Sequence, residues 1–285
     1  MVDKRLGWLI YRNEDIHKNE RFINFLHEAA EQYDLVLSLV SYEDLVYQLA
    51  NGTTSFTDKE KPSFVINRSV SPWLNEVIAL NGIRVFNNAT VARLANDKRL
   101  THAYFQHKGI RMLPTVSTTK LQLVKQPPLS FPFVVKDPLS RGGVGVFHVK
   151  TEKELVELAP SFSDDCIVQP VCDSPGKDLR VYIMNNEIVA AILRESETST
   201  EIRANISTGG TSRLYDLSHR EKMLITKMCE EITIDFAGID FLFDKNGDLL
   251  FNEMEDAVGC RSLYMNSEIN IAALFMKHVK ETLLS

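Results

Sequence analysis

Residues Ala237–Arg261 read A-G-I-D-F-L-F-D-K-N-G-D-L-L-F-N-E-M-E-D-A-V-G-C-R. Two short apolar runs flank Asn246-Gly247, and this dipeptide between such runs is the strongest short-range signal of a β-hairpin. A two-residue turn there predicts that Asp240 lies directly opposite Glu253. Glu255 shares the face of Glu253, because side chains alternate along a strand.

The opposite face of this hairpin is expected to pack on the core. It collects the apolar side chains Ile239, Phe241, Phe243, Leu250 and Met254. A loop one residue longer or shorter would place Asn252 opposite Asp240 instead, but the apolar face favours the two-residue turn.

The three carboxylates Asp240, Glu253 and Glu255 repel one another unless a cation lies between them. Oxygen ligands on a rigid sheet suit Mg²⁺ or Mn²⁺, and Mg²⁺ is usually held by one or two carboxylates together with substrate phosphates. The alternative is a solvated acidic face, which antiparallel sheets often present. The hairpin alone leaves both interpretations open.

The composition is that of an ordinary soluble protein. The chain has 285 residues, 44% of them hydrophobic and 25% charged, which is enough for two or three compact units. Its net charge of −6 argues against a general binder of nucleic acid or of anionic membranes. No apolar run approaches the roughly 18 residues that span a bilayer, no signal peptide is recognisable, and the four cysteines lack metal-site spacing. We therefore expect a cytoplasmic protein with reduced thiols and no nucleic-acid or membrane partner.

The first ninety residues alternate between strand-like and helix-like runs, which predicts a small parallel sheet with right-handed crossovers. The expected strands are Leu6–Tyr11, Leu35–Val40, Phe64–Asn67 and Ile83–Phe86, and the expected helices cover Phe22–Ala29, Tyr42–Ala50 and Trp73–Asn81. No G-x-G-x-x-G follows the first strand, so a dinucleotide fold is poorly supported. Arg68 follows the third strand, where open parallel sheets place ligand-binding residues; a surface arginine is the alternative.

A glycine-rich loop follows the middle of the chain. An apolar strand ends at Lys136, the loop holds Gly142, Gly143 and Gly145, and a second strand begins at Val146. Glycines allow close approach and backbone N–H donation to an anion, and a lysine at the end of the strand adds charge. The alternative is a hairpin with a flexible tip. No G-K-[ST] follows, so this is not a Walker loop.

A second hairpin is expected to turn at Asn185-Asn186. It carries Asp178, Arg180 and Arg194 among apolar neighbours, and arginines inside strands are uncommon unless they pair or face a ligand. A polar loop from Glu201 to Leu214, rich in groups that bind anions, follows it.

These motifs, taken in order, resemble those of the ATP-grasp carboxylate–amine ligases, and most of all the RimK-like branch. The order is a lysine before a helix, a V-V-K strand, the glycine loop, V-Q-x-V, D-[LI]-R, R-x-N…G-G and A-G-[IV]-D…N-E-x-E, between Thr90 and Arg261. The resemblance implies a three-part α/β fold: an N-terminal parallel α/β domain (1–90), a central lid domain (91–170) and a C-terminal catalytic domain with an antiparallel sheet (171–285).

The resemblance also implies roles for individual residues. Phosphate and nucleotide contacts fall to Lys98, Lys136, Gly142, Gly143, Gly145, Gln169, Val171, Asp178 and Arg180. Catalytic contacts to the phosphates and the activated carboxylate fall to Arg194, Arg203 and Asn205. The implied Mg²⁺ or Mn²⁺ ligands are Asp240, Glu253 and Glu255, which the hairpin groups independently.

Four positions depart from the family pattern: Ser140 replaces a loop glycine, Pro170 a common glutamate, Glu255 the usual asparagine and Val258 a proline. An extra carboxylate is compatible with a metal site. The altered segment after Glu255 puts the substrate in question more than the chemistry.

The implied activity is ATP-dependent formation of an amide bond through an acyl phosphate. Phosphoryl transfer asks mainly for positioning and charge neutralisation, which lysines, arginines and Mg²⁺ provide. The substrate would be an amino acid, a peptide or a carrier protein, and a homodimer or homotetramer fits the family. The alternatives are another ATP-grasp chemistry, such as D-alanine-type ligation, and a non-catalytic nucleotide-binding protein that retains the fold.

Overall fold

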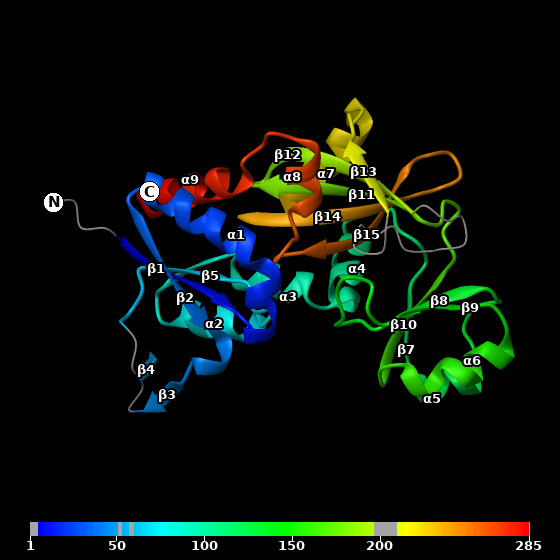
Figure 1. Cartoon of the computed structure of the whole chain (residues 1–285). Coiled ribbons are helices and arrows are strands. Elements are labelled where there is room, and N and C mark those ends of the chain that lie inside the picture. The colour runs from blue at the N-terminus through cyan, green and yellow to red at the C-terminus, as the bar shows by residue number, and fades with distance from the viewer. Residues whose placement is uncertain (1–4, 51–52, 57–59, 197–209, 285) are drawn as a thin grey trace.

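The structure is a computed structural model that describes residues 5–50, 53–56, 60–196 and 210–284. Three larger sheets follow one another along the chain (Figure 1). The first is parallel and the other two are antiparallel, which confirms the predicted α/β fold with three parts.

The N-terminal sheet has the strand order β2-β1-β5-β6, and all its neighbouring strands are parallel. Successive side chains of β1 alternate between its two faces: Leu9 and Tyr11 pack beneath α1, whereas Trp8 and Ile10 pack against α2. The bounds of these elements are β1 Arg5–Tyr11, α1 Asn13–Gln32, β2 Leu35–Ser41, β5 Phe64–Asn67, α2 Pro72–Leu80 and β6 Arg84–Phe86.

The helix predicted over Tyr42–Ala50 is wrong. A short 3-10 turn, Tyr42–Asp44, is followed by β3 (Tyr47–Ala50), which pairs antiparallel with β4 (Thr53–Phe56). The two residues between these strands are Asn51 and Gly52, the same dipeptide that predicts the hairpin near the C-terminus. The hairpin signal was therefore present in the sequence, and the strand-forming residues on both sides agree with it.

The second sheet has the order β7-β10-β8-β9 and is antiparallel throughout. Its apolar core includes Phe133, Val135, Leu155 and Val168, and α5 and α6 contribute to it. In Figure 1 this unit lies apart from the N-terminal sheet, at the lower right. The bounds are β7 Val116–Thr119, α5 Lys120–Lys125, β8 Phe133–Lys136, β9 Val146–Val149, α6 Glu152–Leu158, a 3-10 turn at Ala159–Ser161 and β10 Asp165–Pro170.

The third sheet has the order β13-β12-β11-β14-β15. One of its faces packs against α3, α4 and α7, and the other joins the core that α1, α8 and α9 form with the N-terminal sheet. The bounds are α3 Ala89–Ala95, α4 Lys98–His107, β11 Lys177–Met184, β12 Glu187–Glu195, β13 Thr211–Leu214, α7 His219–Glu231, β14 Phe236–Phe243, β15 Leu249–Glu255, α8 Arg261–Asn266 and α9 Ile271–Leu284.

The β14–β15 hairpin has the predicted pairing at its functional end but a different turn. Gly247 has a φ of 82°, and the N–H of Asp244 donates to the carbonyl of Asp248 at 2.9 Å, so Lys245–Gly247 form a three-residue loop. An irregularity at Asn252 restores the register, and Asp240 lies opposite Glu253.

The longer loop changes which residue of β15 reaches the core. Phe251, and not Leu250, lies opposite Phe241 and joins Ile239, Phe243 and Met254 on the apolar face. Leu250 lies opposite Leu242, on the other face. The assignment of Leu250 to the core face is therefore wrong, because the loop is one residue longer than predicted.

Among the helices of the described ranges, none combines the length and the apolar character needed to cross a membrane.

Candidate functional site

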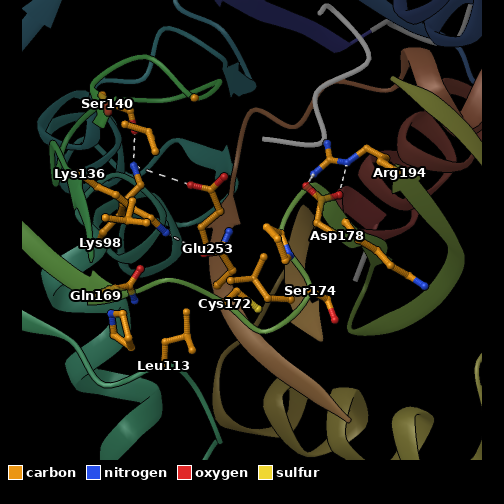
Figure 2. A pocket seen from close by; sticks show the side chains of 18 of the residues that line it. Lys98, Leu113, Lys136, Ser140, Gln169, Cys172, Ser174, Asp178, Arg194 and Glu253 are labelled. Carbon is orange, nitrogen blue, oxygen red and sulfur yellow. Dashed lines mark hydrogen bonds and ion pairs between the residues drawn. The ribbon is translucent and has the colours of Figure 1, made fainter. Parts of the chain in front are cut away.

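A cleft between the second and third sheets brings together residues from distant parts of the chain (Figure 2). Seven of the residues predicted from sequence line it: Lys98, Lys136, Gly143, Gln169, Asp178, Arg194 and Glu253. Gly142, Gly145, Val171, Arg180, Asp240 and Glu255 are not part of this lining. Arg203 and Asn205 lie outside the described residues.

Two lysines converge on β15 from different elements. Lys98 begins α4, which Asp97 caps by accepting a hydrogen bond from the N–H of Arg99. Its Nζ donates to the Ser140 carbonyl and lies 3.7 Å from Oε2 of Glu253. Lys136 ends β8, and its Nζ donates to Oδ1 of Asn252 at 2.9 Å. Burial lowers the pKa of Lys136 to about 8.

The glycine loop after Lys136 depends on backbone conformations that favour glycine. Gly142, Gly143 and Gly145 have φ values of 63°, 76° and 68°. A Cβ at Gly145 would also lie 2.9 Å from Cβ of Asp137. The loop is tied to the segment directly after β15 through Arg141, which pairs with Asp256.

Asp240, Glu253 and Glu255 lie together as the hairpin predicted, with one potential ligand atom of each within 4.8 Å of the others. Arg180 and Arg194 neutralise much of their charge. Arg180 binds Asp240 through two hydrogen bonds of 2.8 and 2.7 Å and also lies 3.1 Å from Glu255. Arg194 reaches Asp240 at 2.8 Å.

Burial and nearby charged side chains together set the pKa values of three carboxylates at the site. Burial favours protonation of Asp240, but Arg180 and Arg194 outweigh it and lower the pKa to about 2. Burial raises the pKa of Asp178 to about 6, although Arg194 binds it at 2.5 and 3.0 Å. Burial also raises the pKa of Glu253, against the attraction of Lys98.

The donor set fits a hard divalent cation. A carboxylate offers about four lone-pair positions, and the three arginine hydrogen bonds to Asp240 leave one of them, on Oδ1. Glu253 lies among carboxylates, and its contact with Lys98 is 3.7 Å long. Oxygen donors at this spacing suit Mg²⁺ or Mn²⁺.

One buried acceptor in the cleft has no partner in the part of the chain that the structure describes. Gln169 donates from Nε2 to Thr115 at 2.8 Å, but no described residue donates to its buried Oε1. Leu113, Val134 and Leu242 also line the cleft. A flat ligand that carries an N–H donor, such as the exocyclic amine of adenine, fits such a position.

Sequence reasoning missed several residues of the cleft, including Ser140, Cys172, Ser174, Lys177 and Asn252. Asn252 contacts Lys136 because the bulge in β15 accommodates it, and no sequence motif marks that bulge. The sequence gives no sign of Cys172 at this site, because the four cysteines lack metal-site spacing.

His102 supports the floor of the site from α4. Its Nε2 donates to the Asn252 carbonyl at 2.7 Å, and its Nδ1 lies 3.1 Å from Thr115 Oγ1. Burial lowers the pKa of His102 to about 4, and Lys136 and Lys98 add to this effect. The folded protein therefore holds this imidazole neutral.

We expect acid to destabilise the protein through His102. Between pH 6.5 and 4 the unfolded chain binds a proton at this residue that the folded chain does not bind, so stability falls as the pH falls. The loss attributable to His102 is about 3 kcal/mol. Denaturant unfolding at pH 7 and pH 4 measures it, because His102→Gln should reduce the difference between the two pH values by that amount. His17→Gln, at a 95% exposed side chain, is the control and should leave the difference unchanged.

Comparison with known proteins gives consistent results. The family model of the RimK-like ATP-grasp domain matches residues 95–279. The MG012 homolog of Mycoplasma pneumoniae is 28% identical over 237 residues, which cover 78% of each chain. The glutamate–LysW ligase ArgX of Sulfurisphaera tokodaii is 25% identical, and the alignment covers 93% of this chain and 95% of that ligase. The structure of D-alanyl-alanine synthetase A from Vibrio cholerae superposes with a TM-score of 0.74, at 16% identity and with both chains fully covered.

Proposed function

The chain belongs to the RimK-like ATP-grasp family of ATP-dependent C–N ligases, and from this premise we propose that it activates a carboxylate as an acyl phosphate. An amine then attacks the activated carbon, the amide bond forms, and ADP and phosphate leave. The proposed substrates are amino acids, peptides or a carrier protein. The glutamate–LysW ligase supports this class because its name gives an amino acid, glutamate, as one of the two groups that it joins.

One observation carries the proposal. Lys98 contacts both the glycine loop, through the Ser140 carbonyl, and the carboxylate cluster, through Glu253 (Figure 2). Anion-binding and cation-binding groups thus meet at one point. Transfer of a phosphoryl group between two oxygens needs both kinds of group close together, because the phosphates must be held by lysines and a metal ion at once.

We assign the phosphates to Lys98, Lys136 and the glycine loop, and the base to Gln169 and Val171. Asp178, Arg180 and Arg194 are assigned to the charged floor, and Arg203 and Asn205 are proposed to contact the activated carboxylate. Mg²⁺ held by Glu253, Glu255 and the remaining lone pair of Asp240 would neutralise phosphate charge. Residues 1–90, 91–170 and 171–285 are the proposed domains.

The test is ATP turnover by the purified full chain with Mg²⁺. We expect ADP to be released when a mixture of amino acids and dipeptides is added and very little without it. Lys136→Ala should lose this turnover because a cation at the phosphates is removed. Lys150→Ala, at an exposed lysine just beyond β9 of the same sheet, should keep it.

The alternatives give different results. Binding of ATP without turnover in any mixture would favour the non-catalytic nucleotide-binding protein. Turnover stimulated by D-alanine alone would favour D-alanine-type ligation. ADP release that does not depend on any added amine or carboxylate would contradict the ligase proposal.

A further inference from the structure

The N-terminal sheet has a topological switch point between β1 and β5. From β1 the chain moves outward to β2 on one side and returns to β5 on the other, as the strand order β2-β1-β5-β6 shows. Tyr11 ends β1, Arg68 directly follows β5, and the N–H of Arg68 donates to the Ile10 carbonyl at 2.8 Å. Open parallel sheets bind ligands beyond the carboxyl ends of the two strands at such a point.

Arg68 is buried there without a counter-ion. Its side chain is 5% exposed, and its Nη2 donates to the Val258 carbonyl at 2.8 Å. Within the described ranges no carboxylate pairs with it, and its buried Nε has no hydrogen-bond partner. Arg180 and Arg194, which are also buried, each bind carboxylates. A buried guanidinium without an anion is costly unless a ligand supplies the anion.

A second unpartnered polar group lies beside it. The Tyr11 hydroxyl is buried and, among the residues described, finds no acceptor for its proton. Burial raises the pKa of Tyr11, and the neighbouring Arg68 opposes this rise. The guanidinium of Arg68 lies 5.6 Å from the centroid of the Tyr11 ring and 4.9 Å from that of Phe22. Two adjacent donors that lack acceptors suit a carboxylate, which has acceptor positions only.

The backbone next to Arg68 is strained. Val70 has a φ of 58°, in the left-handed region that β-branched residues rarely adopt. Its neighbour Ser69 is buried, and the Ser69 carbonyl accepts a hydrogen bond from Nε of Arg12 at 3.0 Å. Such strain persists where the surroundings enforce it and is concentrated at ligand-binding positions.

The segment after Glu255 joins Arg68 to the strand pair that carries the carboxylate cluster. The Val258 carbonyl accepts from Arg68, and the Val258 side chain faces Gly238, where an added Cβ would lie 2.4 Å from its Cγ2. Gly238 lies directly opposite Glu255 in the β14–β15 ladder. Val258 stands where the family resemblance implies a proline, so this chain departs from the family pattern at the residue that contacts Arg68.

We propose that Arg68, with the Tyr11 hydroxyl, binds a substrate carboxylate that does not react. This rests on the proposed ligase function and specifies its substrate class: an amino acid or peptide that keeps a free carboxylate while another of its groups forms the new bond. Arg213 and Arg261 are poorer choices, because Arg213 has a 63% exposed side chain that lies 3.9 Å from Glu195, and Arg261 is exposed.

The test measures equilibrium binding, which does not require turnover. The full chain is saturated with a non-hydrolysable ATP analogue and Mg²⁺, and calorimetry then compares the twenty amino acids and a set of dipeptides with their C-terminal amides. We expect at least one free acid to bind about 10- to 100-fold more tightly than its amide, the ratio for one or two charge-assisted hydrogen bonds. Arg68→Gln should abolish this preference, and Tyr11→Phe should reduce it several-fold.

Arg84→Gln is the matched control, because Arg84 lies on β6 of the same sheet but is paired with Asp235 at 2.5 Å. It should keep the preference for the free acid. The proposal is overturned if no free acid binds, or if Arg68→Gln keeps the preference. If Arg68→Gln does not fold, an unchanged preference in Tyr11→Phe overturns it.

The binding and turnover results separate the two proposals. Free-acid binding that depends on Arg68, without ADP release, would contradict the ligase function and leave the carboxylate site standing. ADP release together with a preference for the free acid that persists in Arg68→Gln would support the ligase function and contradict the carboxylate site at Arg68. Steady-state kinetics on the active pair then assigns the carboxylate to a substrate, since Arg68→Gln should raise the KM of the amine acceptor or of the carboxyl donor, whichever Arg68 holds.

Discussion

Glu253→Gln is expected to lower ATP-dependent ligation by about a thousandfold or more, the scale on which losing one electrostatic contact to a transition state acts. Glu253 lies opposite Asp240, close to Glu255 and 3.7 Å from Lys98, so it is the central oxygen donor of the cluster. Glutamine keeps the shape of the side chain but removes the charge that holds a divalent cation. Turnover at increasing Mg²⁺ and Mn²⁺ concentrations measures the loss.

Glu255→Asn is the matched variant. Asparagine keeps one oxygen ligand and is the residue usual in the family at this position, so much of the activity should remain while the metal preference shifts. Equal loss in both variants at saturating metal would give Glu255 a role beyond ligation. An unchanged metal dependence in both would mean that the three carboxylates form a solvated acidic face and hold no metal.

Arg180→Met is expected to lower the free energy of unfolding by about 3–5 kcal/mol when divalent cations are absent. Arg180 binds Asp240 through two hydrogen bonds and lies 3.1 Å from Glu255, and all three side chains are largely buried. Methionine keeps most of the aliphatic stem but leaves these carboxylates with less cationic charge. Urea unfolding in the presence of a chelator measures the effect.

Arg220→Met provides the control for that measurement. Arg220 also pairs with an aspartate, Asp248 at 3.0 Å, but its side chain is 79% exposed, so its removal should cost less than about 1 kcal/mol. If the two variants lose similar amounts of unfolding free energy, the burial of Arg180 does not govern its contribution to stability.

The sequence predicted the elements whose apolar pattern is long and regular. The parallel strands and the hairpin at Asn185-Asn186 follow from period-two patterning and turn residues, whereas the opposition of Asp240 and Glu253 also needs the bulge at Asn252, which offsets the longer turn. The β3–β4 hairpin was missed because Tyr42–Ala50 is short enough to suit a helix or a strand, although Asn51-Gly52 marked the turn.

Side-chain partners across the molecule were harder to predict. The motifs predict that Arg180 and Arg194 bind a ligand, which stays a prediction, but they do not predict that both arginines bind buried aspartates. These contacts depend on the order β12-β11-β14, and strand order is not written in the local sequence. Arg68 was predicted to lie at the end of its strand, but its burial without a carboxylate depends on the segment around Val258, 190 residues away.

The bulge at Asn252 has a consequence for how this hairpin can change during evolution. Asn252 is held from outside the hairpin, by Lys136 at 2.9 Å and through its carbonyl by His102 at 2.7 Å. The register at Glu253 is thus fixed by contacts with β8 and α4, whatever the length of the distant turn. Insertions and deletions between Asp244 and Asp248 should consequently be tolerated among descendants of this chain, while a single residue gained or lost between Asn252 and Glu255 would move the carboxylates to the wrong face.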